Sequence, residues 1–248
     1  MTMKIENKTF LIFGCNGLIG QSITKKLSRE GAKIFAADIE LTDSQTFKDE
    51  NIEFIQLDIN DENSVSRFLK KNKNLDGAVN CTYPRNKNFG KSLLEVDIEN
   101  FNENVSLGLG GAFLFSKLCA SYFLENKKNF SLINLSSVYG VIAPKFDVYK
   151  NTSMTMPIEY SAIKSGLIHI SKYITSYIND SRFRINCISP GGILDGQDSK
   201  FLKAYKSHSF GKGMLDPEDI CDAIIFLLSE NSKYINGQNI IIDDGYSL

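Results

Sequence analysis

The residues in this sequence that most clearly suggest chemistry are Tyr160 and Lys164, which stand four positions apart in the segment Tyr-Ser-Ala-Ile-Lys. At helical spacing the two side chains share one face, so the ammonium group can stabilise a phenolate and lower the tyrosine pKa from its ordinary value of about 10. A phenol tuned in this way exchanges a proton with a substrate oxygen near neutral pH. The pair therefore predicts general acid–base catalysis.

Spacing alone is a weak argument, because Tyr83 and Lys87 are also four residues apart. That second pair contains Pro84 and lies in a polar stretch, where we expect no helix. Tyr160 instead opens a run of apolar residues at helical spacing, namely Ile163, Leu167, Ile170 and Ile174. We therefore predict that Tyr160 is catalytic and interpret Tyr83 as a coincidental match. The alternative for Tyr160 is an ordinary tyrosine at the start of a helix.

A glycine-rich segment near the N-terminus indicates a site for a dinucleotide. Residues 9–13 have the composition of a strand, and Gly14, Gly17 and Gly20 lead from it into an amphipathic helix. Glycines permit a tight turn there and let backbone N–H groups approach a pyrophosphate at the helix N-terminus, where the partial positive charge favours anions. Any strand-to-helix turn can use a glycine, so this signal needs support from elsewhere.

Support comes from Asp38, which ends a second predicted strand at residues 32–37 and stands 18 residues after Gly20. A carboxylate at this place binds the hydroxyl groups of the adenosine ribose. It also repels a 2′-phosphate, so we expect NAD rather than NADP as the cofactor. The alternative is that Asp38 only ends a strand.

Strand and helix signals alternate along the whole chain. Strands are expected at residues 9–13, 32–37, 52–57, 77–80, 131–135, 184–188 and 240–242. Between them we expect helices near 18–27, 42–49 and 65–69, a long helix at 104–123, the Tyr160 helix and a last helix from Asp216. This order predicts an α/β fold of the single-domain Rossmann type, a doubly wound parallel sheet with helices on both faces.

In such a fold, ligands bind beyond the carboxyl ends of the strands. Several polar or turn-forming residues fall directly after predicted strands and are therefore expected at the site: Asp38, Asp58, Asn80, Ser137 and Pro190. The agreement among these separately weak signals is the main argument for the prediction.

Composition fits one domain spanning residues 1–248. The chain is 42% hydrophobic and has no Pro-, Gly- or Ser-rich linker, so it can bury one large core. A formal net charge of −1 gives no sign of binding to nucleic acid or to an anionic membrane. The polar start does not resemble a signal peptide, and no apolar run approaches membrane-spanning length, so we expect a cytoplasmic protein.

The cysteine and histidine content gives no pattern typical of a metal site. The five cysteines are scattered without a Cys-x-x-Cys pair, which is typical of buried thiols in a reducing compartment. The chain has only two histidines, His169 and His208. We therefore predict no metal.

Taken together, the motifs resemble those of the short-chain dehydrogenases/reductases over nearly the whole chain. The resemblance rests on the glycine turn, Leu-Asp58-Ile, Val-Asn80-Cys-Thr, Ile-Asn-Leu-Ser-Ser137, the Tyr160–Lys164 pair and Ser-Pro190-Gly-Gly. It implies hydride transfer at a nicotinamide, with Ser137 polarising the substrate carbonyl, Tyr160 transferring the proton, and Lys164 lowering the tyrosine pKa and holding the nicotinamide ribose.

The same resemblance implies a set of cofactor contacts. These are Gly14, Asn16, Gly17, Ile19, Gly20, Asp38, Asp58, Ile59, Asn80, Tyr160, Lys164, Pro190, Gly191 and Ile193.

Three positions depart from the family pattern. Leu18 stands where the short members have their second glycine, which indicates a cofactor loop shaped like that of the longer members. Gly108 stands where a helix asparagine supports the proton relay, so a water molecule or Asn104, one turn away, is the expected substitute. Asp195 stands where a threonine contacts the carboxamide, so that contact is not expected here.

The interval between Ser137 and Tyr160 is about ten residues longer than in short members, and residues 143–158 form the expected insertion at the mouth of the site. With the Asp-Asp-Gly-Tyr-Ser-Leu terminus and the segment after Asn80, it resembles a bacterial subgroup, the flagellin-modification protein A type. That resemblance implies a sugar or nucleotide-sugar substrate in surface-glycan biosynthesis.

Clustered cations give a separate indication of an anionic, phosphorylated or nucleotide-linked substrate. A substrate lid is expected at residues 194–215, and both this segment and the one after Asn80 carry basic side chains: Lys200, Lys203, Lys206, His208, Lys212, Arg85, Lys87 and Lys91. Such cations can steer and bind a phosphate. A solvated loop surface is the alternative.

Two classes of function remain open from the sequence. The first is an NAD(P)-dependent oxidoreductase that interconverts a secondary alcohol and a ketone on a sugar, with a 3-oxoacyl-type carbonyl reductase that prefers NADPH as its alternative. The second is a non-catalytic NAD(P)-binding protein. From the family we also expect a homodimer or homotetramer, formed by the helix at 104–123 and the Tyr160 helix, although their apolar residues can equally all face the sheet.

Overall fold

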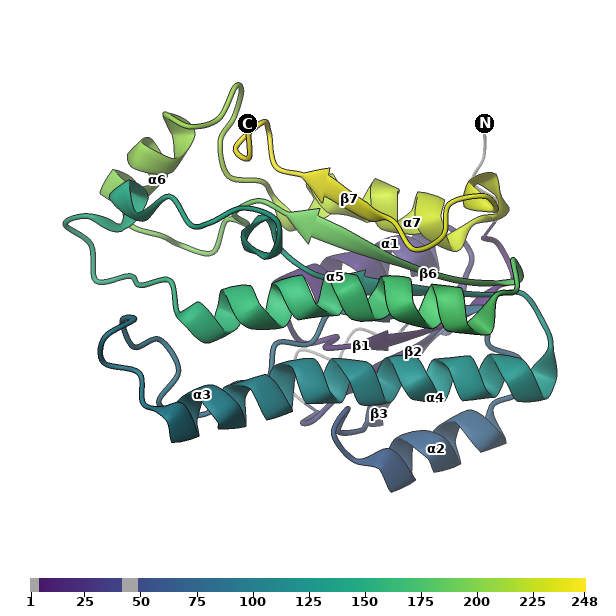
Figure 1. Cartoon of the computed structure of the whole chain (residues 1–248). Helices are drawn as coiled ribbons and strands as arrows, with labels where there is room; N and C mark the ends of the chain where they lie inside the picture. The colour runs from purple at the N-terminus through teal and green to yellow at the C-terminus, as the bar shows by residue number, and fades with distance from the viewer. Residues whose placement is uncertain (1–4, 42–48) are drawn as a thin grey trace.

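The protein is built around one parallel β-sheet (Figure 1). The computed structural model describes residues 5–41 and 49–248, and the predicted helix at 42–49 lies outside the described residues except for Asp49. The strands stand in the order β3-β2-β1-β4-β5-β6-β7, and every pair is parallel. They are β1 Thr9–Phe13, β2 Lys33–Asp38, β3 Ile52–Gln56, β4 Gly77–Asn80, β5 Phe130–Leu135, β6 Phe183–Pro190 and β7 Asn239–Ile242.

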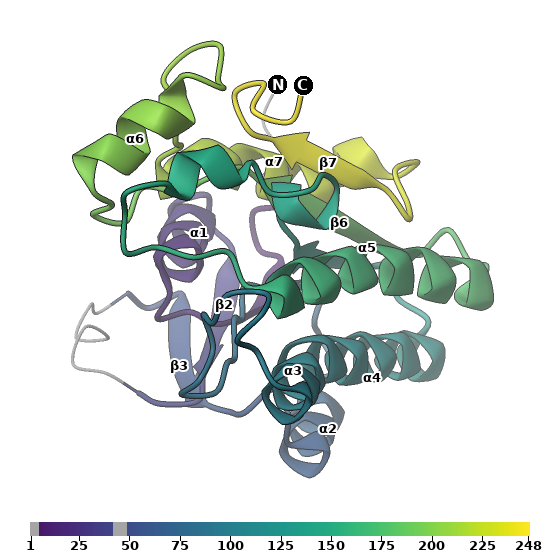
Figure 2. The same cartoon turned by 60° about the vertical axis from the view of Figure 1, so that its left-hand side comes forward.

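Helices cover both faces of this sheet, as predicted (Figure 2). One face carries α1 (Leu18–Arg29) and α7 (Cys221–Leu228), whose apolar residues form one buried cluster with the strands. The other face carries α2 (Glu62–Lys71), α4 (Gly111–Asn126) and α5 (Ile158–Ile178), which bury a second cluster. Because both faces are covered, every residue of the central strands β4 and β5 is buried, and their sequences are mostly apolar rather than alternating.

The long helix before β5 is interrupted by one wider turn. It begins as α3 (Ile98–Val105), continues as a π-helix at Ser106–Gly110 and ends as α4. An 18-residue window of this helix is long and apolar enough to cross a membrane by composition, contrary to the expectation from sequence, but half of that window is buried. The helix therefore serves as a core helix that packs on α2 and α5.

The carboxyl side of the sheet is roofed by three segments that lie far apart in the sequence. The segment after β5 contributes two short 3-10 turns, Val138–Gly140 and, within the predicted insertion, Phe146–Tyr149. The predicted lid contributes α6 (Ser199–Lys206), and the chain returns after β7 to place Tyr246 beneath them. The remaining short 3-10 turns, Pro217–Ile220 and Glu230–Ser232, flank α7. Sequence analysis did not predict α6 within the lid.

Aromatic side chains hold this roof together. Tyr205 of α6 stacks face to face on Tyr246, with ring centroids 4.0 Å apart. The Tyr246 hydroxyl bonds that of Tyr139 at 2.8 Å, and Tyr149 packs on Phe201 with centroids 5.3 Å apart. These contacts join the insertion, the lid and the C-terminal segment into one cluster.

Candidate active site

The glycine turn after β1 brings two backbone segments into close contact. Gly14 has a φ of +79°, a conformation that favours glycine, and a Cβ at this position would lie 2.8 Å from the carbonyl carbon of Cys81. A Cβ on Gly20 would overlap the backbone of Gly14. Gly17 is the N-cap of α1, which leaves the first N–H groups of that helix without a capping side chain. The turn thus has the shape and the free donors that a pyrophosphate requires.

Asp38 lies beside this turn at the end of β2. One carboxylate oxygen accepts the N–H of Asn16 at 2.9 Å, and the other accepts the N–H of Ile39 at 2.8 Å. Each oxygen keeps a second lone pair, which can accept a ribose hydroxyl. The carboxylate is therefore fixed by the backbone at the wall of a cavity of 620 Å³.

That cavity receives many of the residues expected to bind the adenosine half of the cofactor. It is lined by Gly14, Asn16, Gly17, Asp38, Asp58 and Ile59, together with Ile39, Asn60, Thr82, Tyr83 and Arg85. Ile19, Pro190, Gly191 and Ile193 line a second cavity of 360 Å³, which also contains the predicted catalytic residues. The residues present therefore fit a dinucleotide laid across both cavities.

Asn80 and Gly20 do not line either cavity. The Asn80 side chain is 3% exposed; its amide donates to Asn134 at 3.3 Å and its oxygen accepts from the hydroxyl of Thr82 at 2.7 Å. Asn80 thus fixes the start of the loop after β4. Gly20 acts through close packing of α1 on the turn.

Ser137, Tyr160 and Lys164 lie together in the second cavity. Ser137 follows β5 and caps the 3-10 turn at Val138–Gly140. Tyr160 and Lys164 project from the first turns of α5, as the four-residue spacing predicted. The Lys164 ammonium donates to the carbonyl oxygen of Leu135 at 2.7 Å and lies 5.7 Å from the centroid of the Tyr160 ring.

The pKa of Tyr160 departs from the expectation. Burial raises it above its ordinary value, and the factor that opposes this shift is a hydrogen bond with Ser137, not Lys164. The sequence-based expectation of a tyrosine pKa lowered by Lys164 is therefore wrong for this structure. Burial destabilises the phenolate by more than the hydrogen bond with Ser137 stabilises it. Burial also lowers the pKa of Lys164 to about 8, against the weaker opposing effects of Cys81 and Cys187.

The position of the missing helix asparagine is filled by a hydrophobic side chain. Gly108 lies in the π-helical turn, and a Cβ there would come within 2.9 Å of Ile163. Asn104 is fully buried, but its oxygen accepts the N–H of Asn86 at 2.9 Å and its amide lies 3.4 Å from Glu159. The contacts of Asn104 thus hold the loop after β4 and do not extend to Lys164.

The rest of this cavity is lined by residues that sequence analysis did not assign to the site. Most are aromatic or contain sulfur: Tyr83, Tyr139, Tyr149, Met154, Met156, Phe201, Tyr205 and Met214. Asp195 and Gln197 supply polar groups. The signal for Tyr83 was its place just after the fourth strand. The others come from segments with no periodic pattern, and only the fold brings them together.

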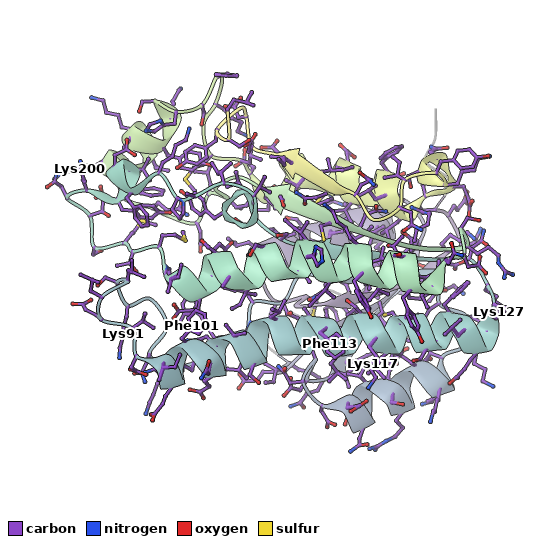
Figure 3. The ribbon with its side chains drawn as sticks, viewed as in Figure 1. Lys91, Phe101, Phe113, Lys117, Lys127 and Lys200 are labelled. Atoms are coloured by element: carbon purple, nitrogen blue, oxygen red, sulfur yellow. The ribbon has the colours of Figure 1, made fainter. Side chains whose placement is uncertain are left out.

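The basic residues of the lid do not converge on this cavity. Lys200, Lys203, Lys206 and Lys212 are absent from its lining. Lys212 instead bonds Asp216 at 2.7 Å and also Asp219, and His208 bonds Asp147 of the insertion at 2.7 Å. Lys91 pairs with Asp97 at 3.1 Å, and Figure 3 shows Lys91 and Lys200 at the same end of the molecule, on its outside. The argument from the lid lysines for an anionic pocket therefore loses its support.

No group of three or more histidine, cysteine or carboxylate side chains able to hold a metal ion occurs in residues 5–41 and 49–248. The five cysteines are free thiols, four of them buried.

Comparison with known proteins agrees with the class of protein that the fold and the site define, an NAD(P)-dependent oxidoreductase. The family described as Enoyl-(Acyl carrier protein) reductase matches residues 16–247. A crystal structure of a short-chain dehydrogenase from Leptospira borgpetersenii with bound NAD⁺ is 30% identical, covers 98% of this chain and 94% of its own, and superimposes with a TM-score of 0.89. This chain belongs to the short-chain dehydrogenase/reductase family.

Two relatives bear on the finer question of substrate. Post-translational flagellin modification protein A of Campylobacter coli is 37% identical over 98% of this chain and 100% of its own length. The 3-oxoacyl-[acyl-carrier-protein] reductase FabG of Thermotoga maritima is 27% identical over 98% of this chain and 99% of its own length.

Proposed function

We propose that Ser137, Tyr160 and Lys164 carry out the interconversion of a secondary alcohol and a ketone. The bound nicotinamide supplies or accepts the hydride. The Ser137 hydroxyl donates to the substrate oxygen and holds it beside Tyr160, whose phenol gives or takes the proton. Lys164, fixed by the Leu135 carbonyl, holds the ribose and adds positive charge near the phenol. The observation that carries this assignment is the position of all three groups in one cavity.

We further propose that NAD is the cofactor and NADP the less favoured one. Asp38 lines the adenosine cavity, and backbone N–H groups fix both of its carboxylate oxygens. The carboxylate is therefore held where its charge would repel a 2′-phosphate. The NAD⁺ bound in the Leptospira structure supports the same choice. Arg85 lines the same cavity and favours the phosphate.

As the substrate we propose a sugar, sugar phosphate or nucleotide sugar of flagellin or polysaccharide biosynthesis. The flagellin-modification relative supports this assignment, as do the flat aromatic walls and the few polar groups of the cavity, which suit a ring whose orientation must be fixed. Because no lid lysine lines the cavity, a phosphate or nucleotide group would lie outside it, beside the exposed face of α6.

A 3-oxoacyl-type carbonyl reductase is the second candidate, and the same cavity favours it in one respect. Its walls carry three methionines and five aromatic rings besides Tyr160, a lining that also suits an acyl chain. The FabG relative matches over the full length. A non-catalytic NAD(P)-binding role has the least support, since the catalytic groups are all present in one cavity.

We also propose a cytoplasmic homodimer or homotetramer that joins through α4 and α5. These helices run side by side, and their outer face leaves large apolar side chains exposed: Phe113, Leu124, Tyr173 and Tyr177. Figure 3 shows Phe113 and Lys117 on α4, and both line a cavity of 380 Å³ between α4 and α5. Sedimentation that finds only monomer would reject the assembly.

Calorimetric titration with NADH and with NADPH at matched salt tests the cofactor, and a panel of keto-sugars and 3-oxoacyl thioesters then tests the substrate. Tighter NADH binding and turnover of a keto-sugar are the expected results. Tighter NADPH binding with turnover of the thioester would establish the second candidate. Binding of neither nucleotide would contradict both.

A further inference from the structure

Tyr83 lies where the adenosine cavity and the catalytic cavity meet. Its side chain lines both of them. Its ring packs edge to face on Tyr160, with centroids 5.3 Å apart, and the Lys164 ammonium lies 5.7 Å from its centroid. One ring thus contacts the two residues that hold and protonate the reacting groups.

The loop that carries Tyr83 is anchored on both sides of it. Before it, the N–H and hydroxyl of Thr82 donate to Asn80, at 3.1 Å and 2.7 Å. After it, the Asn86 N–H donates to the buried Asn104 at 2.9 Å. The position of the ring is therefore set by the sheet and by the long helix, although the segment has no regular secondary structure.

The surroundings of the ring explain why it faces inward although 40% of Tyr83 is exposed. Phe89 packs edge to face on the ring, with centroids 5.5 Å apart, and the Arg85 guanidinium lies 5.0 Å from the ring centroid. Cations over an aromatic face are stabilising, and two lie near this one. The loop thus uses Arg85 and Phe89 to hold the ring over Tyr160.

We propose that Tyr83 is a positioning residue of the active site, whose ring shields Tyr160 and Lys164 from water and forms the wall against which the nicotinamide end of the cofactor binds. Burial is the first cause of the raised pKa of Tyr160 and of the lowered pKa of Lys164, so the ring that covers both contributes to both shifts. The other titratable or charged groups that act on these three residues are Arg85 on the same loop, Cys81 after β4, Tyr149 on the insertion, Glu159 on α5 and Cys187 on β6. Ser137 adds a hydrogen bond to Tyr160.

Binding of NADH and of ADP to Tyr83→Ala and Tyr83→Phe tests this role. ADP fills only the adenosine and pyrophosphate part of the site, and because the chain has no tryptophan, NADH emission is followed without overlap. We expect Tyr83→Ala to weaken NADH binding roughly tenfold, ADP binding to change less than about twofold, and Tyr83→Phe to restore the NADH affinity. Tyr234→Ala, at the opposite edge of the sheet, is the matched control.

Unchanged or tighter NADH binding in Tyr83→Ala would overturn the proposal, since the ring would then be a bystander or an obstruction. An equal loss for ADP and NADH would also overturn it, because that pattern indicates a general collapse of the loop. Tyr83→Leu repeats the test in case alanine disturbs folding. In addition, the absorbance titration of Tyr160, isolated by subtracting the Tyr160→Phe background, should give a lower pKa in Tyr83→Ala than in Tyr83→Phe.

Discussion

The cofactor half and the substrate half of this active site are built in different ways. The cofactor half consists of strand ends and one glycine turn, so its groups lie within a few residues of sheet positions such as Asp38 and Asp58. The substrate half is roofed by the insertion, the lid and the C-terminal segment, which meet through the stacked rings of Tyr205 and Tyr246. The first half is therefore fixed by the sheet, whereas the second depends on contacts between distant loops.

This difference indicates which properties can vary independently. The backbone bonds that hold Asp38 do not involve the roof, so the choice of cofactor is separable from the choice of substrate. Loops carried on a rigid sheet are where binding specificity changes most readily. Tyr83 and Tyr160 lie at the boundary between the halves and couple them.

Tyr160→Phe gives the sharpest separation of chemistry from binding. Loss of the phenol removes the proton donor, and we expect turnover to fall about 10³-fold. The affinity for NADH should stay within about threefold, because the ring and its packing remain. Steady-state kinetics combined with NADH titration checks both values. Turnover close to that of the unmodified protein would eliminate the proposed mechanism.

Lys164→Met should abolish most activity while stabilising the protein. Burial lowers the pKa of Lys164 to about 8 in the folded state, so below pH 8 the side chain is charged in both the folded and the unfolded protein. In that pH range the folded protein bears the full free-energy cost of burying the charge. The shift from 10.5 limits the gain in free energy of unfolding to about 3 kcal/mol, and loss of the bond to Leu135 reduces it.

The sign of this effect follows from proton binding. Between pH 8 and about 10.5 the unfolded state binds more protons than the folded state, so the unmodified protein gains stability as the pH rises. The advantage of Lys164→Met should therefore shrink over this interval. Urea unfolding at pH 7 and pH 10 measures the difference in free energy of unfolding between Lys164→Met and the unmodified protein. A difference that grows with pH would contradict the assignment of a buried, charged lysine.

Asp38→Asn should change only the cofactor half. Removing the charge weakens the bonds to the ribose and ends the repulsion of a 2′-phosphate, so the ratio of NADH to NADPH affinity should fall roughly tenfold. Glu40→Gln removes a nearby exposed charge and is the control. If the affinity ratio is unchanged in Asp38→Asn and altered in Glu40→Gln, then Glu40 and not Asp38 sets the cofactor preference, and the proposal is wrong.

His208→Ala should change only the substrate half, and by the smallest amount. The bond from His208 to Asp147 joins the lid to the insertion at the exposed rim, so its loss should raise the KM of the substrate about two- to fivefold without changing NADH affinity. Lys203→Ala, exposed on the same lid, is the control. An effect on NADH binding would show that the halves are not separable.

Sequence analysis predicted the sheet well because parallel strands buried on both faces are continuous apolar runs. The strands at 9–13 and 77–80 were placed with their correct ends, and β6 extends by one residue before and two after the predicted range. The glycine turn and the Tyr160 pair were found for a related reason, since each depends on short, local spacing. The family assignment that rests on them is confirmed.

What the sequence did not reveal depends on contacts between distant residues. Tyr83 was interpreted as coincidental because its helical spacing failed, but its role comes from packing against a residue 77 positions away, Tyr160. For the lid lysines the sequence left two interpretations open, a site for an anionic substrate and a solvated loop surface. The acidic partners of Lys212 show that the positions of charges along the chain do not determine where the side chains point.

The π-helical turn at Ser106–Gly110 also constrains how this protein can change length. A π-helical turn takes up about one residue more than an α-helical turn, so deleting one residue within it would give a regular α-helix and leave α3 nearly in phase with α4. Deleting a second residue, from a helix now regular throughout, would turn everything before the deletion by about 100° around the helix axis, and Asn104 would leave the buried position from which it holds Asn86. The helix on which the sheet packs is thus also a spacer, and its residue count sets where the loop carrying Tyr83 is attached.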